Sequence, residues 1–207
     1  MYGRMTRLQS SPDSIDKGIS FFKENVAPKA RSTPGNAGAI LLVDRKSGTA
    51  IGITLWETTE ALNASEQFGI SSRTQSAAAA GGSVIDVYRY EQVMADRAQP
   101  PKVGTFVRLN TVHGSPDKLD NVVKFMQKQV LPALKAQKGY RALVMNINRT
   151  TGRSTVSTIW DTMADLEASE SAVSGLRRDA ADAAGAKDVK VEIFESVFSE
   201  IKQPASV

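Results

Sequence analysis

The chain contains the same sequence pattern twice. A shift of 104 positions places Ser11-Pro12-Asp13 on Ser115-Pro116-Asp117, and it places Trp56 on Trp160. The shift gives roughly 26 identities over about 95 positions without a gap, where chance would give about six. A repeat of this length predicts two copies of one structural unit, so each half must be interpreted as a fold of its own.

Each copy shows the same order of predicted elements. An alternating strand is followed by a helix with one apolar face, and then by two strands joined through a turn that contains Gly48 or Gly152. A helix capped by Thr58 or Thr162 and a last strand complete the βαββαβ order. The predicted strands are 2–8, 39–43, 50–56 and 84–90 in the first copy, and 106–112, 142–147, 154–160 and 189–194 in the second.

In a four-stranded sheet of this order, the two helices cover one face and leave the other face bare. A half of about 100 residues cannot leave a whole sheet face in water, so two bare faces are expected to pack together. The predicted class is α+β, with two fused ferredoxin-like βαββαβ halves packed sheet to sheet as a pseudo-twofold α/β barrel. The expected divisions are a first repeat at 1–94, a Pro-Pro linker at 95–104, a second repeat at 105–201 and a tail at 202–207.

Two equivalent stretches resemble a known family. They read Trp-Glu-Thr-x-Glu-Ala-Leu from Trp56 and Trp-Asp-Thr-x-x-Asp-Leu from Trp160. With the order of elements, they are similar to the dimeric α/β-barrel superfamily, in its antibiotic-biosynthesis-monooxygenase-like branch, here as a tandem-repeat member. The resemblance covers both halves and implies the fold. It leaves the chemistry open, because that superfamily includes cofactor-free oxygenases, heme-degrading monooxygenases and isomerases.

Composition excludes several kinds of catalytic site. The chain has no cysteine, which rules out thiolate catalysis, iron–sulfur clusters and disulfides. A histidine metal site or a Ser-His-Asp hydrolase would depend on the single histidine, His113. We therefore expect no metal and no cofactor, and the sequence identifies no catalytic residue.

Charge and apolar runs bear on partners and location. The net charge of +4 contains no block of five like charges, and RNA-recognition modules of the same βαββαβ order need aromatic residues where 39–43 and 142–146 are aliphatic. The longest apolar run, 37–43, is far shorter than the roughly 20 residues of a membrane helix, and residues 1–7 contain no signal-peptide core. We expect a cytoplasmic protein with a small-molecule ligand and no nucleic-acid or membrane partner. Whether two chains form a homodimer stays open.

Trp56 and Trp160 end the third strand of each copy. If their side of the strand faces the space between the sheets, each ring lines a cavity, and the resemblance implies substrate contact, because the heme-degrading members have a strand-end Trp at this place. The alternative is that each ring packs under the following helix, with its N–H hydrogen-bonded.

Arg4 and Arg108 occupy equivalent places on the first strands. A guanidinium facing the other sheet could bind an anionic group through two hydrogen bonds. The alternative is structural, because first and last strands of this fold are neighbours, so Arg4 could pair with Glu91 and Arg108 with Glu195. Arg45, Lys46 and Arg149 are interpreted as solvated charges of the hairpin turns.

Asn110 and His113 occur only in the second copy, where the first has Thr6 and Gln9. The heme-degrading members use a first-strand Asn together with the Trp and a helix His that binds iron. Asn110 fits that Asn only with a register slip, and neither second helix contains a histidine. His113 is therefore expected to be solvated, and heme degradation is disfavoured.

Three functions follow from these residues. The first is cofactor-independent oxygenation of an aromatic or polyketide-like anion in the inter-sheet cavity, with Trp160, Arg108 and Asn110 as walls; a pocket of roughly 300 Å³ or more would favour it. The second is a non-catalytic small-molecule carrier or interaction module on the same barrel, and the third is heme binding by His113. If only one copy keeps a pocket, we expect it to be the second copy, because Val156 and Val173 of the second copy stand where the first copy has Gly52 and Gly69.

Overall fold

The computed structural model describes residues 1–202, which form two compact units. Of the described residues, the first unit comprises 1–90, 101–103 and 195–202, and the second comprises 91–100 and 104–194. The units and the sequence copies therefore have different boundaries, because each unit takes a short segment from the other copy. Of the expected tail at 202–207, residues 203–207 lie outside the described part.

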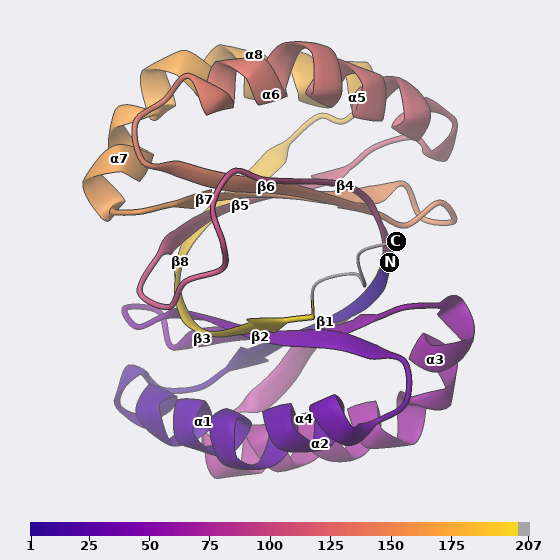
Figure 1. Ribbon diagram of the computed structural model, residues 1–207, viewed down its shortest axis with the longest axis vertical. Helices are drawn as coiled ribbons and strands as arrows, with labels where there is room; N and C mark the ends of the chain where they lie inside the picture. Colours follow the sequence, from indigo (N-terminus) through magenta and orange to yellow (C-terminus); the bar gives the residue numbers. More distant parts are fainter. Residues whose placement is uncertain (203–207) are drawn as a thin grey trace. The chain divides into compact units, whose positions relative to one another are not determined.

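The first unit contains the helices of the first copy on one face of its sheet (Figure 1). The sheet has the order β1-β3-β2-β8, with antiparallel pairing throughout. Its elements are β1 (Tyr2–Gln9), η1 (Pro12–Ser14), α1 (Ile15–Phe21), η2 (Phe22–Val26), α2 (Ala27–Ser32), β2 (Asn36–Asp44), β3 (Thr49–Trp56), α3 (Thr59–Ala64), α4 (Glu66–Ala79) and the first part of β4 (Ser83–Arg97).

The second unit repeats this plan with the sheet order β5-β7-β6-β4. Its elements are β5 (Phe106–His113), η3 (Pro116–Lys118), α5 (Leu119–Phe125), η4 (Met126–Val130), α6 (Leu131–Lys135), β6 (Tyr140–Ile147), β7 (Arg153–Trp160), α7 (Met163–Ala168), α8 (Glu170–Ala184) and the first part of β8 (Val189–Ile201). The predicted α+β class and the βαββαβ order of both halves are confirmed. The packing of the two sheets into one barrel stays a prediction.

The long strands β4 and β8 carry the exchange between the copies. The end of β8 pairs with β2, from Glu195 opposite Val43 to Ile201 opposite Gly38. The end of β4 pairs with β6, from Glu91 onward. Strand β4 continues to Arg97, into the segment that the sequence suggested as a linker.

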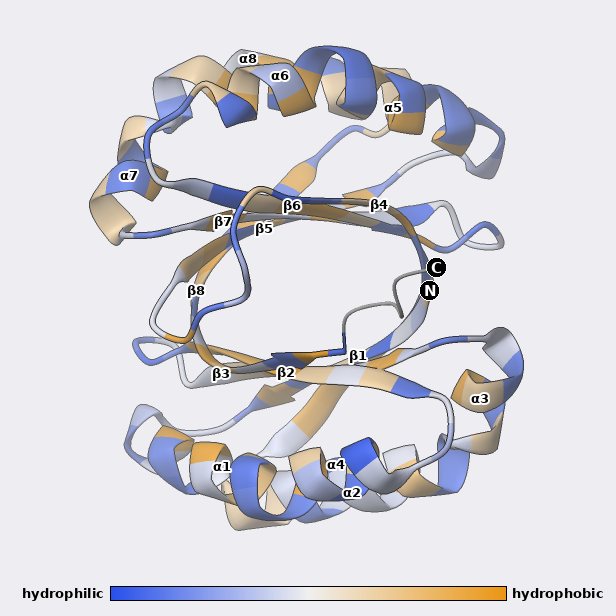
Figure 2. Ribbon diagram, in the orientation of Figure 1, coloured by the Kyte–Doolittle hydropathy of each residue, from blue (hydrophilic) through white to orange (hydrophobic). Residues whose placement is uncertain are grey.

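The first helix of each copy buries the face that its apolar spacing predicts. Ile15, Ile19, Phe22 and Val26 are buried in one unit, as are Leu119, Val122, Met126 and Val130 in the other. Figure 2 shows hydrophilic and hydrophobic residues alternating along these helices, as expected for elements with one buried side. In both copies the middle of this helix is π-helical, at η2 and η4. Such wide turns are rare and often occur at functional sites.

Local signals set the ends of the other helices. Thr58 and Thr162 cap α3 and α7 as predicted, each accepting a 3.1 Å hydrogen bond from the backbone N–H three residues on. Ser11 and Ser115 precede the first helix of each copy, but neither side chain makes a capping hydrogen bond, and a 3-10 turn with Pro at its start follows each serine.

Candidate functional site: a cavity between sheet and helices in each unit

Strand register decides which residues meet the helices. In β1 and β3, Arg4 lies opposite Thr54 and Thr6 lies opposite Gly52, so the side chains of Arg4, Thr6 and Thr54 share one face of the sheet. That face lies against α1, η2 and α4, whose side chains line the same cavity. The prediction that the Arg and Trp side of the strands faces the space between the two sheets is therefore wrong, and it is wrong in the second unit for the same reason.

The first cavity lies between the sheet and the helices of the first unit and has a volume of about 60 Å³. Strands and helices contribute mostly apolar walls with arginine and serine side chains among them. Residues that line it include Arg4, Thr6, Gly52, Thr54, Phe22, Phe68, Gly69, Ser72, Arg73 and Ser76.

The second cavity is its counterpart in the second unit, also about 60 Å³. Residues that line it include Arg108, Asn110, Val156, Thr158, Met126, Val173, Leu176, Arg177 and Ala180. A cavity therefore exists in both copies, so the condition for expecting one in the second copy alone is not met.

The two tryptophans lie beside these cavities and not in their walls. Both rings are completely buried. The Trp56 Nε1–H donates to Thr54 Oγ1 at 3.2 Å, and Trp160 donates to Thr158 at 2.9 Å. Trp56 also packs edge to face against Phe68 of α4. This is the structural alternative for a strand-end Trp, and the threonines that accept from the indoles do line the cavities.

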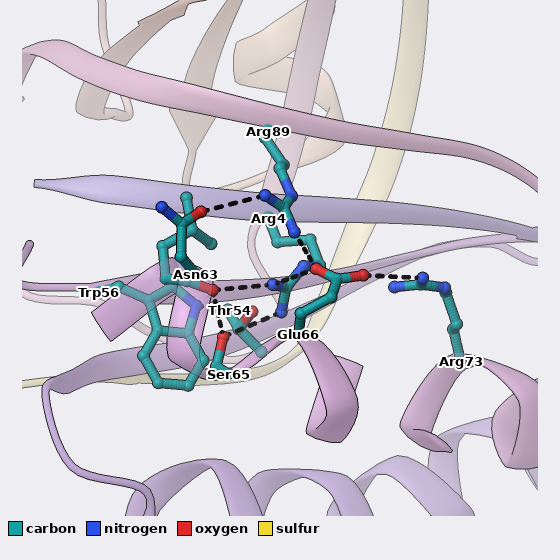
Figure 3. A network of polar contacts seen from close by, with 9 residues as sticks. Arg4, Thr54, Trp56, Asn63, Ser65, Glu66, Arg73 and Arg89 are labelled. Carbon is teal, nitrogen blue, oxygen red and sulfur yellow. Dashed lines mark hydrogen bonds and ion pairs between the residues drawn. The ribbon is translucent and has the colours of Figure 1, made fainter. Parts of the chain in front are cut away.

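Arg4 is held at the junction where helix α3 ends and helix α4 begins (Figure 3). Its guanidinium donates to Ser65 Oγ at 3.1 Å, to the carbonyl of Leu62 at 3.0 Å and to Glu66 Oε2 at 2.8 Å. The residue is 3% exposed, and burial lowers the pKa of this guanidinium more than the Glu66 charge raises it. The predicted pairing of Arg4 with Glu91 is wrong, because Arg4 faces the helices.

The carboxylate of Glu66 forms ion pairs with three guanidinium groups. Arg73 donates to it at 3.0 Å, Arg4 at 2.8 Å, and Arg89 of β4 also bonds to it (Figure 3). Burial favours the protonated form, but the hydrogen bonds from Arg73 and Arg89 and the charge of Arg4 outweigh it, so the pKa of Glu66 lies below its ordinary value. Three cations around one anion give this cluster a net charge of +2 and fix the side chains that border the first cavity.

The second unit has a simpler version of the cluster. Arg108 donates to the Leu166 carbonyl at 2.6 Å and to Ser169 Oγ at 3.0 Å, and its Nη2 lies 3.1 Å from Glu170. Arg177 binds Glu170 through two hydrogen bonds of 2.9 and 2.7 Å, which lower the pKa of that carboxyl. Ile193 stands where the first copy has Arg89. The predicted pairing of Arg108 with Glu195 is also wrong.

Asn110 lines the second cavity and is 8% exposed. Its Nδ2 donates to the carbonyl of Val156 at 3.3 Å, and its Oδ1 is buried without a hydrogen-bond partner among the described residues. The amide cannot be turned round, because Oδ1 would then face the Val156 carbonyl and two acceptors would meet. The first cavity shows the reverse: buried donors without partners are Arg4 Nε and Arg73 Nη1.

The remaining sequence candidates lie outside the cavities. His113 is exposed at the end of β5, opposite Arg153, so its predicted exposure is confirmed although it lies in a strand. Arg45 and Arg149 are half-exposed, but each also bridges two carboxylates, Asp16 with Glu195 and Asp120 with Glu91 respectively. The interpretation as simple solvated turn charges is incomplete for these two arginines.

Sequence reasoning missed Glu66, Glu170, Arg73 and Arg177. The signal was present, because the repeat matches Ala-Ser-Glu in both copies and also aligns the two arginines seven residues further on.

Within residues 1–202 there is no group of three His, Cys, Asp or Glu side chains placed to hold a metal ion. None of the described helices combines the length and apolar character needed to span a bilayer.

Comparison with known proteins places this geometry among characterised folds. No family model matches the chain. Two Mycobacterium tuberculosis H37Rv proteins, each described as uncharacterized, match the whole chain: Rv2557 at 28% identity over 92% of its length and Rv2558 at 29% over 88%.

Solved structures share the fold at low sequence identity. An anthrone oxidase-like protein matches with a TM-score of 0.69 at 14% identity, over 100% of this chain and 97% of its own. An uncharacterized ferredoxin-fold protein related to antibiotic biosynthesis monooxygenases, from Listeria monocytogenes 4b F2365, matches with a TM-score of 0.53 at 8% identity, over 94% of each chain. A heme-degrading enzyme from Listeria monocytogenes matches with a TM-score of 0.54 at 8% identity, over 93% of this chain and 98% of its own. The chain therefore has the ferredoxin-like fold of proteins related to the antibiotic biosynthesis monooxygenases.

Proposed function

We propose that the chain is a small-molecule-binding protein on the monooxygenase-like fold, and that each unit binds ligand in its cavity between sheet and helices. The observation that carries this proposal is the set of buried polar atoms without partners on residues that line the cavities. Arg4, Arg73 and Asn110 each contribute one such atom. A buried polar atom without a partner costs about 1–3 kcal/mol, and a ligand that satisfies it recovers that free energy.

The volume limits what can enter. About 60 Å³ is far below the roughly 300–1,000 Å³ of pockets that enclose a drug-sized ligand. Each cavity therefore receives water or one small functional group, and a larger ligand reaches it only if the helices move outward. Helices α1 and α5 continue into the π-helical segments η2 and η4, whose residues Phe22 and Met126 line the cavities, so these segments are where such movement would start.

A thermal-shift titration with sodium benzoate and benzyl alcohol tests binding. We expect a ligand-dependent rise in the unfolding temperature, since a ligand that binds only the folded state stabilises it. Filling the first cavity with Gly69→Val and the second with Ala180→Leu should abolish the rise. The matched control is Gly175→Val, which adds the same side chain to α8 at a position where a new Cβ would have no neighbouring atom within 4 Å. An unchanged rise in the filled variants would refute the cavity assignment.

A second candidate function is cofactor-independent oxygenation of an aromatic anion. It is favoured by the fold shared with an anthrone oxidase-like protein and by the buried Arg4 guanidinium of the first cavity, which would stabilise a phenolate-like anion in a site with little water. In such a reaction the anthrone methylene becomes a carbonyl, one oxygen atom of O₂ enters the product and the other leaves as water. An oxygen electrode with dithranol as substrate tests it: an enzyme consumes one O₂ per dithranol above the spontaneous rate, and a rate equal to the spontaneous one leaves the binding function alone.

A further inference from the structure

The two cavities have equivalent positions in the repeat, so their lining residues can be compared one by one. The repeat places Arg4, Thr54 and Arg73 at the same positions as Arg108, Thr158 and Arg177, and all six line their cavities. Other lining positions differ between the two cavities. Thr6, Ser72 and Ser76 of the first cavity become Asn110, Leu176 and Ala180 in the second.

The first cavity offers donors. Arg4 Nε and Arg73 Nη1 are buried without partners among residues 1–202, and a guanidinium can only donate. The nearest carboxylate, Glu66, is shared by Arg4, Arg73 and Arg89, so the cluster keeps two positive charges in excess. A group that accepts hydrogen bonds and carries negative charge satisfies both features.

The second cavity offers an acceptor. Asn110 Oδ1 is its buried atom without a partner, and both terminal nitrogens of Arg177 already bind Glu170. The cluster of Arg108 and Arg177 with Glu170 has a single positive charge in excess, because Ile193 replaces Arg89. A neutral group with an O–H or N–H donor satisfies Asn110, whereas a carboxylate meets an oxygen that repels it.

We infer that the two cavities select functional groups of opposite character: the first takes the carboxylate or phenolate group of a ligand, and the second takes a neutral alcohol, phenol or amide group. This inference rests on the proposed binding function and specifies the ligand class of each site. One chain would thus bind two different chemical groups, which a duplicated site with identical residues could not do.

Fluorine NMR on the intact chain tests the inference. The chain has two tryptophans, one beside each cavity, so labelling with 5-fluorotryptophan gives two signals that Trp160→Phe assigns. Benzoate and benzyl alcohol are matched probes, since they share the ring and differ in the polar group. We expect benzoate to shift the Trp56 signal at concentrations at least tenfold below those that shift Trp160, and benzyl alcohol to show the reverse order.

Variants separate this inference from the binding function. Arg73→Met should weaken benzoate binding, as reported by the Trp56 signal, about tenfold, as expected for the loss of one hydrogen bond to a charged group. It should leave the affinity for benzyl alcohol, as reported by the Trp160 signal, unchanged. Asn110→Leu should do the opposite. If Arg73→Met does not fold, Arg73→Lys keeps the charge and should retain part of the benzoate affinity. Two probes that bind both cavities with equal affinity would overturn the inference and leave the binding function standing; no shift with either probe would overturn both.

Discussion

Glu91 accepts a hydrogen bond from the Nε of Arg149 at 3.0 Å, although the two residues belong to different copies of the repeat. The equivalent contact joins Arg45 to Glu195 at 3.3 Å. Each contact lies inside one compact unit, because the ends of β4 and β8 have crossed into the other copy's sheet. The fold of either unit therefore needs residues from both copies.

Separated copies should fold poorly. A fragment of residues 1–103 lacks the end of β8, which leaves the edge of β2 without its partner, and 104–207 lacks the end of β4 beside β6. We expect each fragment alone to show non-cooperative unfolding by circular dichroism or to self-associate, and a one-to-one mixture to recover cooperative unfolding. A monomeric fragment with a sharp unfolding transition of its own would contradict the strand exchange.

Replacing the buried Arg4 should lower the free energy of unfolding substantially. Arg4→Met leaves the Leu62 carbonyl and Ser65 with one partner fewer and removes a cation from Glu66, so we expect a loss of about 2–4 kcal/mol in the free energy of unfolding. Arg31→Met is the matched control, because the Arg31–Glu200 pair is about half-exposed and worth at most about 1 kcal/mol. Urea unfolding of both variants measures the difference. Equal losses would show that burial of Arg4 adds nothing.

Much of this could be predicted from sequence, because the repeat constrains every element twice. The helix faces, the hairpin turns and the Thr58 and Thr162 caps depend on local spacing, which is visible in both copies. The direction of the Arg4 and Trp56 side chains was not predictable, because alternation in a strand shows that two faces exist and not which one meets the helices. The strand exchange was not predictable for a similar reason. Two equivalent copies leave open whether the end of β8, which begins at Glu195, pairs with a strand of its own copy or with a strand of the other copy.

Acid should weaken the protein through Glu66. The folded-state pKa of Glu66 lies below its ordinary value, so its contribution to stability is present above the unfolded-state pKa of about 4.3 and is lost as the pH falls through the lower folded-state value. We expect the stability difference between the wild type and Glu66→Gln to be largest above about pH 5 and to shrink below about pH 4. Urea unfolding from pH 3 to 7 measures it, with Glu170→Gln for comparison. A difference independent of pH would contradict the assigned direction.

Gly69 makes room for Arg4. A Cβ at this position would lie 2.5 Å from Arg4 Nη1, and the second copy has Val173 here. We expect Gly69→Val to displace the guanidinium, break at least one of its hydrogen bonds and destabilise the protein by about 1–3 kcal/mol despite the better helix propensity of Val. Val173→Gly in the second unit is the reciprocal variant and should leave the Arg108 hydrogen bonds intact. A Gly69→Val protein as stable as the wild type would show that Arg4 adapts without cost.

A crystal structure determined with bound sodium benzoate tests the central claim most directly. We predict electron density for the carboxylate beside Arg73 in the cavity between the sheet and α4, with none beside Asn110. Benzoate bound elsewhere on the molecule with both cavities unchanged would contradict the account.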